Sequence, residues 1–188
     1  MLALAPDAVV LATGAEPAPT DVEGAAADRV LSVEEAVAAP GRVGGTVVLV
    51  DEDGHYRGCG VAEHLARRGR DVRLVTRLAS TAADLPAMNL GPQLARLAEL
   101  RVRVLPQRRV VRLDGSTVVV QPVAGGPEEP YVGVDTVVVA GRRAARDGLA
   151  AALAAAAPDL PLVAAGDCVA PRTALQAIAE GRRAGLTV

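Results

Sequence analysis

A glycine-containing loop at residues 51–60 is the first segment whose residue types suggest chemistry. It lies between the apolar run TVVLV and the run VAEHLA, and it contains Gly54, Gly58 and Gly60. Glycines in such a turn let the backbone approach the pyrophosphate of a dinucleotide at a helix N-terminus. These three lack the G-x-G-x-x-G spacing, and the loop is about two residues longer than that motif. Gly54 is the candidate cofactor-binding residue of the loop.

Three carboxylates in the same loop argue against a nicotinamide nucleotide there. Asp51, Glu52 and Asp53 stand where a phosphate would lie, and their negative charge repels a dianion. Arg77, just after the next apolar run, is a candidate ligand for the 2′-phosphate of NADPH, but a solvated surface arginine is the commoner case. NAD(P)H binding at this loop is therefore doubtful.

The histidines and cysteines offer little metal or redox chemistry. His55, Cys59 and His64 match no common zinc spacing, and Cys59 and Cys168 are too distant for a C-x-x-C pair. We expect no metal site, a surface position for His64, and a packing role for Cys168.

The composition excludes several classes of function. The 188 residues include no Lys, Phe or Trp, and all 20 basic residues are Arg. A P-loop lysine and a Schiff-base lysine are thereby excluded within the chain. A net charge of −2 and two tyrosines argue against a nucleic-acid partner. Neither a signal peptide nor a membrane-spanning run is visible, so we expect a cytoplasmic protein without a membrane partner.

The elements that must position these residues follow an α/β pattern. Residues 46–50 and 71–76 are typical of buried strands, and residues 61–66 between them have apolar positions at helical spacing. This order predicts a βαβ unit with a parallel strand pair. A hairpin at Asp114 and Gly115 adds a small antiparallel piece to a parallel sheet that we expect to carry helices on both faces.

Further elements are expected on either side of the βαβ unit. Ser32 and Glu35 have the spacing of a capping box, which predicts a helix that begins at residue 33. An alanine-rich helix is expected near residues 147–157, and a final helix near residues 173–184.

Three segments, taken in order, resemble flavoproteins that contain two dinucleotide-binding domains. They are DAVVLATGAEP, the βαβ unit, and LPLVAAGDCVAPRTALQAIAEGRRAG. The middle stretch, VVLVDEDGHYRGCGVAEHLARRGRDVRLVT, is similar to the trimethylamine dehydrogenase, histamine dehydrogenase and 2,4-dienoyl-CoA reductase family. GPQLARLAEL and GDCVAPR are similar to the same proteins. The resemblance covers essentially the whole chain, but only the C-terminal part of those enzymes.

The resemblance implies a Rossmann-like fold of the FAD/NAD(P)-binding, glutathione-reductase-like type. Residues 1–45 and 158–188 would form a partial FAD- or ADP-binding domain that lacks its first βαβ, with the first and last segments paired. Residues 46–157 would form an inserted NAD(P)-binding-like domain. In the family, a TIM barrel with FMN, the catalytic residues and an iron–sulfur cluster comes first, followed by a G-x-G-x-x-G βαβ. We expect an isolated C-terminal piece, a separate subunit or a split-gene product.

The resemblance also assigns site residues. Asp167 would accept hydrogen bonds from the ribityl chain of a flavin, and the turn from Gly166 to Arg172 would lead into a helix whose N-terminus faces the pyrophosphate. Thr13 and Gly14 would line the same cleft. The residues alone also allow a simpler interpretation, in which Asp167 caps a helix and Gly14 supports a tight turn.

Two functions of different kinds follow. The first is a nucleotide-binding domain of a flavin-dependent oxidoreductase that is catalytically incomplete alone and binds FAD or ADP only when the missing segment is supplied. The second is a non-catalytic scaffold or interaction module that keeps the fold without a cofactor. A stand-alone NAD(P)H reductase component is a third possibility, which the acidic loop opposes. The partners to expect are a TIM-barrel FMN domain, an electron-transfer protein or a second copy of the chain.

Overall fold

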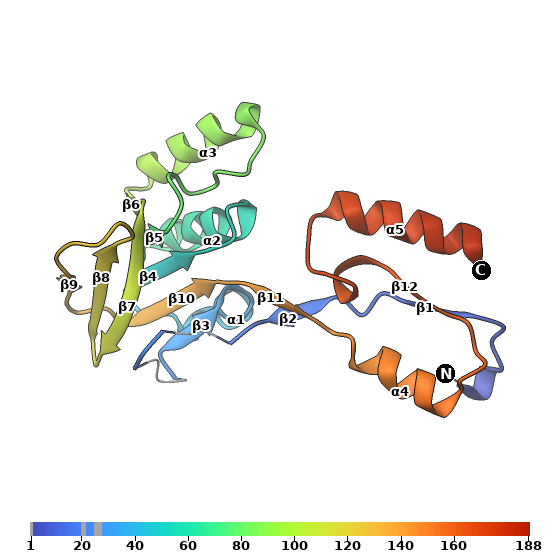
Figure 1. The fold of residues 1–188 in the computed structure, drawn as a ribbon. Coiled ribbons are helices and arrows are strands. Elements are labelled where there is room, and N and C mark those ends of the chain that lie inside the picture. Colours follow the sequence, from blue (N-terminus) through green and yellow to red (C-terminus); the bar gives the residue numbers. More distant parts are fainter. Residues whose placement is uncertain (1, 20–21, 25–27) are drawn as a thin grey trace. The chain divides into compact units, whose positions relative to one another are not determined.

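A computed structural model describes residues 2–19, 22–24 and 28–188 of the chain (Figure 1). The chain divides into two compact units. One, here called the inserted unit, is Pro19–Arg142, and the other, the terminal unit, combines Met1–Ala18 with Arg143–Val188.

The sequence predicts boundaries between residues 45 and 46 and between residues 157 and 158, and the two compact units divide at other places. Residues 19–45 belong to the inserted unit because their strand joins its parallel sheet. Residues 143–157 belong to the terminal unit because their strand pairs with residues 15–17.

The inserted unit is built on a five-stranded sheet in the order β3–β10–β4–β5–β6, and every pairing in it is parallel. Valine-rich strands without polar alternation form it because both of its faces are covered. The central strands are almost wholly buried. The five strands are β3 (Val30–Ser32), β4 (Thr46–Asp51), β5 (Asp71–Thr76), β6 (Arg103–Leu105) and β10 (Thr136–Ala140).

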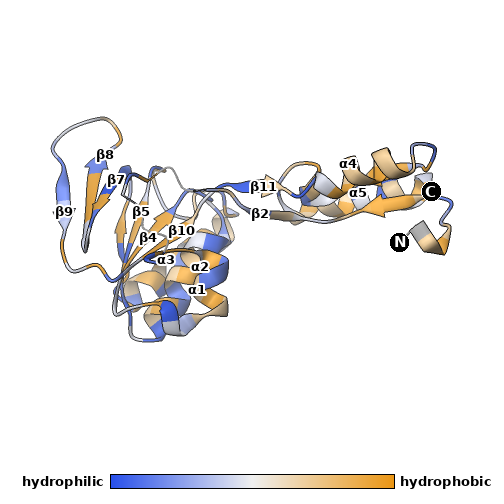
Figure 2. Ribbon diagram, turned by 90° about the horizontal axis from the view of Figure 1, so that it is seen from below, coloured by the Kyte–Doolittle hydropathy of each residue, from blue (hydrophilic) through white to orange (hydrophobic). Residues whose placement is uncertain are grey.

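Two different layers cover this sheet (Figure 2). Three helices pack on one face: α1 (Val33–Ala38), α2 (Tyr56–Arg67) and α3 (Ala87–Glu99). A three-stranded antiparallel sheet packs on the other: β7 (Arg108–Asp114), β8 (Thr117–Pro122) and β9 (Glu129–Tyr131). The expectation of helices on both faces is therefore wrong for this unit, because the hairpin sheet takes the second face.

The predicted βαβ unit and hairpin are confirmed. β4, α2 and β5 follow one another, and β4 and β5 pair in parallel. β7 and β8 pair antiparallel up to Asp114 opposite Thr117, with Gly115 in the turn at φ +55°. Helix α2, however, begins at Tyr56, earlier than residue 61, so that Gly58 and Gly60 lie in the helix rather than in the loop.

The terminal unit brings the two ends of the chain together, as expected. β1 (Val9–Leu11) pairs in parallel with β12 (Leu162–Ala164), and β2 (Ala15–Pro17) pairs antiparallel with β11 (Arg143–Ala145). Its apolar core is small, with Val9, Leu11 and Leu153 buried together. Its helices are α4 (Gly148–Ala156) and α5 (Ala174–Thr187), and its short 3₁₀ turns are Leu2–Leu4 and Gly166–Cys168.

Capping boxes start two of the helices. Ser32 and Glu35 cap α1 reciprocally, as the sequence predicts, and Thr173 and Gln176 do the same for α5. Pro40–Arg42 forms a further 3₁₀ turn after α1. None of the described helices is long and apolar enough to cross a membrane.

Candidate functional site

The turn after β12 is held by a network of charged groups. Gly166 has φ +79°, a conformation that glycine adopts without steric cost, and Asp167 follows it in a 3₁₀ turn. The Asp167 carboxylate accepts a hydrogen bond from Arg143 Nη1 at 2.5 Å through Oδ2 and one from the Arg172 backbone N–H at 3.1 Å through Oδ1. Asp167 thus ties the turn to both β11 and the start of α5.

Glu180, on α5, holds the same turn through its backbone. Its carboxylate accepts a hydrogen bond from the Gly166 N–H at 2.8 Å and pairs with the guanidinium of Arg172. The backbone hydrogen bond from Gly166, followed by the interaction with Arg172, holds the pKa of Glu180 below its ordinary value. The charged form of Glu180 is therefore part of the folded turn.

The second predicted turn, Thr13 and Gly14, is bonded to the segment that follows β11. Thr13 Oγ1 donates to the Arg146 carbonyl at 2.6 Å, and the Arg146 N–H donates to the Gly14 carbonyl at 3.0 Å. Gly14 has φ +75°, and an added Cβ would meet no atom within 4 Å. Glycine is required there by the backbone conformation rather than by crowding.

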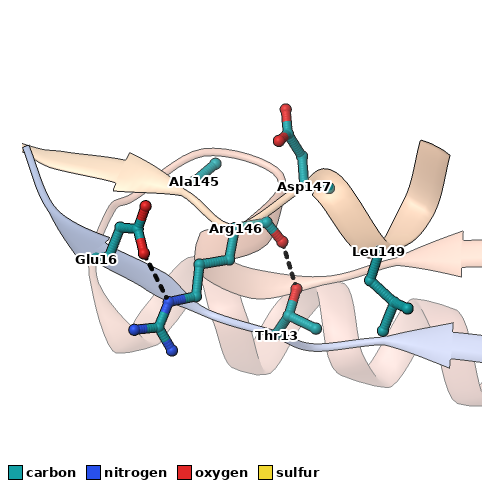
Figure 3. Close-up of a pocket in the computed structure, with 7 residues that line it drawn as sticks. Thr13, Glu16, Ala145, Arg146, Asp147 and Leu149 are labelled. Atoms are coloured by element: carbon teal, nitrogen blue, oxygen red, sulfur yellow. Dashed lines mark hydrogen bonds and ion pairs between the residues drawn. The ribbon is translucent and has the colours of Figure 1, made fainter. Parts of the chain in front are cut away.

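An open hollow of about 430 Å³ lies beside Thr13 (Figure 3). Arg146 crosses one side of it and pairs with Glu16 at 3.3 Å. The N-terminus of α4 forms another side, where Asp147 precedes the helix and makes no side-chain cap. The remaining lining comes from Ala145 and Leu149.

Arg143 is the residue that joins the two turns, and sequence reasoning missed it. Besides its bond to Asp167, its Nη2 donates to the Ala15 carbonyl at 3.1 Å, next to Gly14. Five of the predicted site residues therefore lie in the terminal unit: Thr13, Gly14, Gly166, Asp167 and Arg172. Glu180 was also missed as a site residue, although it lies in the last of the three segments that carry the resemblance.

The other two predicted site residues, Gly54 and Arg77, belong to the inserted unit. Gly54 has φ +71°, and its carbonyl accepts a hydrogen bond from the Asp84 N–H at 2.9 Å. The Arg77 side chain is 59% exposed and pairs with Glu52 at 3.6 Å. The internal ion pair and high exposure favour the surface-arginine interpretation of Arg77.

The sequence suggested that the three carboxylates of this loop face one phosphate position, but in the structure they do not. Asp51 is fully buried, Glu52 pairs with Arg77, and Asp53 pairs with Arg57 at 3.3 Å. The expectation fails because Asp51, the last residue of β4, has its carboxylate bonded within the inserted unit by the Asp53 and Gly54 N–H groups and by Thr81.

The histidine and cysteine residues of the region do not assemble a metal site among the described residues. Cys59 is buried on α2, and its thiol donates to the His55 carbonyl at 3.3 Å. Burial, with the nearby charge of Asp51, raises the pKa of the Cys59 thiol to about 11. Cys168 is buried and donates to the Leu11 carbonyl, in keeping with the packing role predicted for it.

No known family model matches the chain. A curated relative, described as a probable N-methylproline demethylase from Rhizobium meliloti (strain 1021), is 33% identical over 111 residues. That match covers 59% of this chain and 16% of the relative.

Solved structures match over nearly the whole chain. A 6-hydroxypseudooxynicotine amine oxidase from Pseudomonas geniculata N1 has a TM-score of 0.88 at 25% identity, over 97% of this chain and 29% of that one. A histamine dehydrogenase from Rhizobium sp. 4-9 has a TM-score of 0.84 at 25% identity, over 93% and 29%. A 2-naphthoyl-CoA reductase has a TM-score of 0.85 at 26% identity, over 99% and 27%.

The three solved structures carry the names of oxidoreductases, and the chain spans less than a third of the length of each of the four proteins. The proteins that match agree with the resemblance that DAVVLATGAEP, the βαβ unit and the GDCVAPR stretch indicate. The chain is therefore similar, over nearly its whole length, to a part of oxidoreductases of the trimethylamine dehydrogenase, histamine dehydrogenase and 2,4-dienoyl-CoA reductase family.

Proposed function

We propose that the chain is the nucleotide-binding part of a flavin-dependent oxidoreductase, and that its terminal unit contributes Thr13, Gly14, Gly166, Asp167 and Arg172 to a site for FAD or ADP. One observation carries the proposal. The Arg143 guanidinium bonds the Asp167 carboxylate and the Ala15 carbonyl at once, so one arginine joins the two glycine turns.

The residues present fit such a nucleotide. An ionised carboxylate has about four acceptor positions, and Asp167 uses two of them on Arg143 and Arg172. The remaining capacity suits ribose or ribityl hydroxyls. A bound flavin would supply the electron transfer, while this chain would bind and orient it.

The terminal unit supplies only part of such a site. Its parallel sheet has two strands, and the resemblance implies a further βαβ with a G-x-G-x-x-G turn to hold the pyrophosphate. We propose that FAD or ADP binds when that segment is present, and that catalysis needs a TIM-barrel FMN domain. An electron-transfer protein and a second copy of the chain are further proposed partners.

A non-catalytic scaffold is the second candidate function. Its support is that the polar groups of the turn are bonded within the chain: the Gly166 N–H to Glu180, and the Thr13 hydroxyl to Arg146. A turn satisfied in this way keeps its shape without a ligand.

The first test compares nucleotide binding by Asp167→Ala and by the unchanged protein. The chain is joined to the G-x-G-x-x-G segment of a relative, and FAD and ADP are titrated by calorimetry. We expect Asp167→Ala to weaken binding by about tenfold or more, because it deletes hydrogen bonds to a charged acceptor. Asp159→Ala, an exposed aspartate of the same unit, is the matched control. Absence of FAD and ADP binding in the completed protein would favour the scaffold.

A further inference from the structure

The Asp51 carboxylate, at the carboxyl end of β4, is fully buried, and both of its oxygens accept hydrogen bonds. Its Oδ1 accepts hydrogen bonds from the backbone N–H groups of Asp53 at 3.1 Å and Gly54 at 3.4 Å. Its Oδ2 accepts a hydrogen bond from Thr81 Oγ1 at 2.6 Å. Two of the three donors are thus backbone groups of the strand-to-helix turn.

The first turn of α2 lies directly against this carboxylate. A Cβ added to Gly58 would stand 2.4 Å from Asp51 Oδ1 and 2.5 Å from Asp51 Cγ. Real side chains do not approach that closely, so residue 58 is glycine because the carboxylate lies there. The position also favours an anion, since the positive end of the helix dipole lies at the start of α2.

The loop between β5 and α3 closes the turn from outside. Thr81 and Ala82 are fully buried, and Leu85 packs in the same core as α2. The Asp84 N–H bonds to the Gly54 carbonyl, and a Cβ on Gly54 would stand 2.6 Å from Asp84 Oδ2. The turn is therefore filled by a carboxylate and covered by its own chain.

We propose that Asp51 is a built-in anion, whose carboxylate takes the place that a dinucleotide phosphate takes at other strand–glycine–helix turns. Backbone donors, a helix start and a glycine that permits close approach are the parts of a phosphate cradle. Here all three serve a side chain of the same polypeptide. The inserted unit is consequently complete without a nucleotide, and NADH and NADPH do not bind at Gly54.

The first experiment is chemical rescue of Asp51→Gly. The atoms deleted by this change, beyond Cα, are those of acetate. We expect the Tm to fall by about 5–10 °C, since hydrogen bonds to a charged group are lost. Acetate should then raise the Tm of the variant well above its value in chloride at equal ionic strength, whereas the unchanged chain should respond equally to both salts.

Two results would overturn the proposal that Asp51 is a built-in anion. One is an unchanged Tm in Asp51→Gly, and the other is an equal response of variant and unchanged chain to acetate. If the variant does not fold in chloride, the refolding yield in acetate against chloride is the same comparison. Thr81→Val, which removes one of three donors, should lower the Tm by a smaller amount and remain folded.

A double-mutant cycle tests the contact with the helix. Gly58→Ala should lower the Tm sharply, because its Cβ overlaps the carboxylate, whereas Gly60→Ala, with no atom within 4 Å of its Cβ, should not. In the Asp51→Gly background the cost of Gly58→Ala should vanish. An undiminished cost there would contradict the proposal.

Titration of NADH and NADPH separates this inference from the proposed function. Saturable NADH binding that survives Asp167→Ala but is lost in Gly58→Ala would place a nicotinamide nucleotide at the Asp51 turn and overturn the inference. FAD or ADP binding that depends on Asp167 tests only the proposed function of the terminal unit and does not bear on the role proposed for Asp51.

Discussion

Two aspartates, one in each unit, differ in their exposure and in the donors that their carboxylates bond. Asp51 has no exposed surface, and its carboxylate accepts hydrogen bonds from its own turn and from Thr81. Asp167 keeps some exposure and bonds Arg143 and the Arg172 N–H. Burial decides the difference, because a buried carboxylate must find all of its donors within the protein. At the residue scale, exposure therefore separates a structural acid from a candidate ligand-binding acid.

Glu180 should make the stability of the chain depend on pH. The hydrogen bond from Gly166 and the pairing with Arg172 lower its pKa in the folded state. A lowered folded pKa stabilises the fold above the unfolded value, about 4.3, and this stabilisation is lost as the pH falls through the folded value. We expect Glu180→Gln to reduce the Tm at pH 7, and the difference from the unchanged chain to shrink below about pH 4. An equal difference at both pH values would mean that the Glu180 charge does not hold the turn.

At the scale of elements, some helix starts carry a signal in the sequence and others do not. The boxes at Ser32–Glu35 and Thr173–Gln176 are local, since both partners lie within one helical turn. The start of α2 has no such signal, because His55 makes no side-chain cap. Its glycine-rich first turn also disfavours a helix by intrinsic propensity. Packing of Cys59 and Ala62 in the core overrides that propensity.

The α1 cap gives a prediction at this scale. Ser32→Ala removes the acceptor of the Glu35 N–H, which lies at 3.1 Å, and should cost about 1 kcal/mol of unfolding free energy. Ser32→Asp, which retains a capping acceptor, should cost clearly less. Denaturant titration of the three proteins measures the difference, and an equal loss in both variants would contradict the capping role.

At the scale of the molecule, the two units have very different cores. The inserted unit buries valines and leucines on both faces of a five-stranded sheet, and the terminal unit gathers Val9, Leu11 and Leu153 around two strands. Two-stranded sheets are marginal alone. A ligand or partner that bound the terminal unit would therefore stabilise the part of the chain with the smaller core.

Hydrogen exchange should show this contrast. We expect backbone amides of β1 and β12 to exchange much faster than those of β4, β5 and β10, since local opening costs less where less apolar surface is buried. Exchange followed by mass spectrometry checks it on the unchanged chain. Equal protection in both units would show that the small core is not the weaker one.

Local patterns in the sequence were enough to predict several of the elements. Apolar runs gave the parallel strands, Asp114–Gly115 gave the hairpin, and Ser32 with Glu35 gave a helix start. The motif segments also indicated the resemblance to these oxidoreductases, and they predicted five site residues that the fold places in the terminal unit.

The partner of each carboxylate, in contrast, follows from the folding of distant segments onto one another. Arg143 reaches Asp167, Glu180 reaches Gly166, and Asp51 turns inward to Thr81, across separations of 24, 14 and 30 residues. The residue type fixes the charge and the hydrogen-bonding capacity of a side chain. Its burial and its bonding partner depend on packing between segments that are distant in the sequence. For that reason the acidic loop, which in the sequence only repels phosphate, proves in the fold to contain an anion of its own.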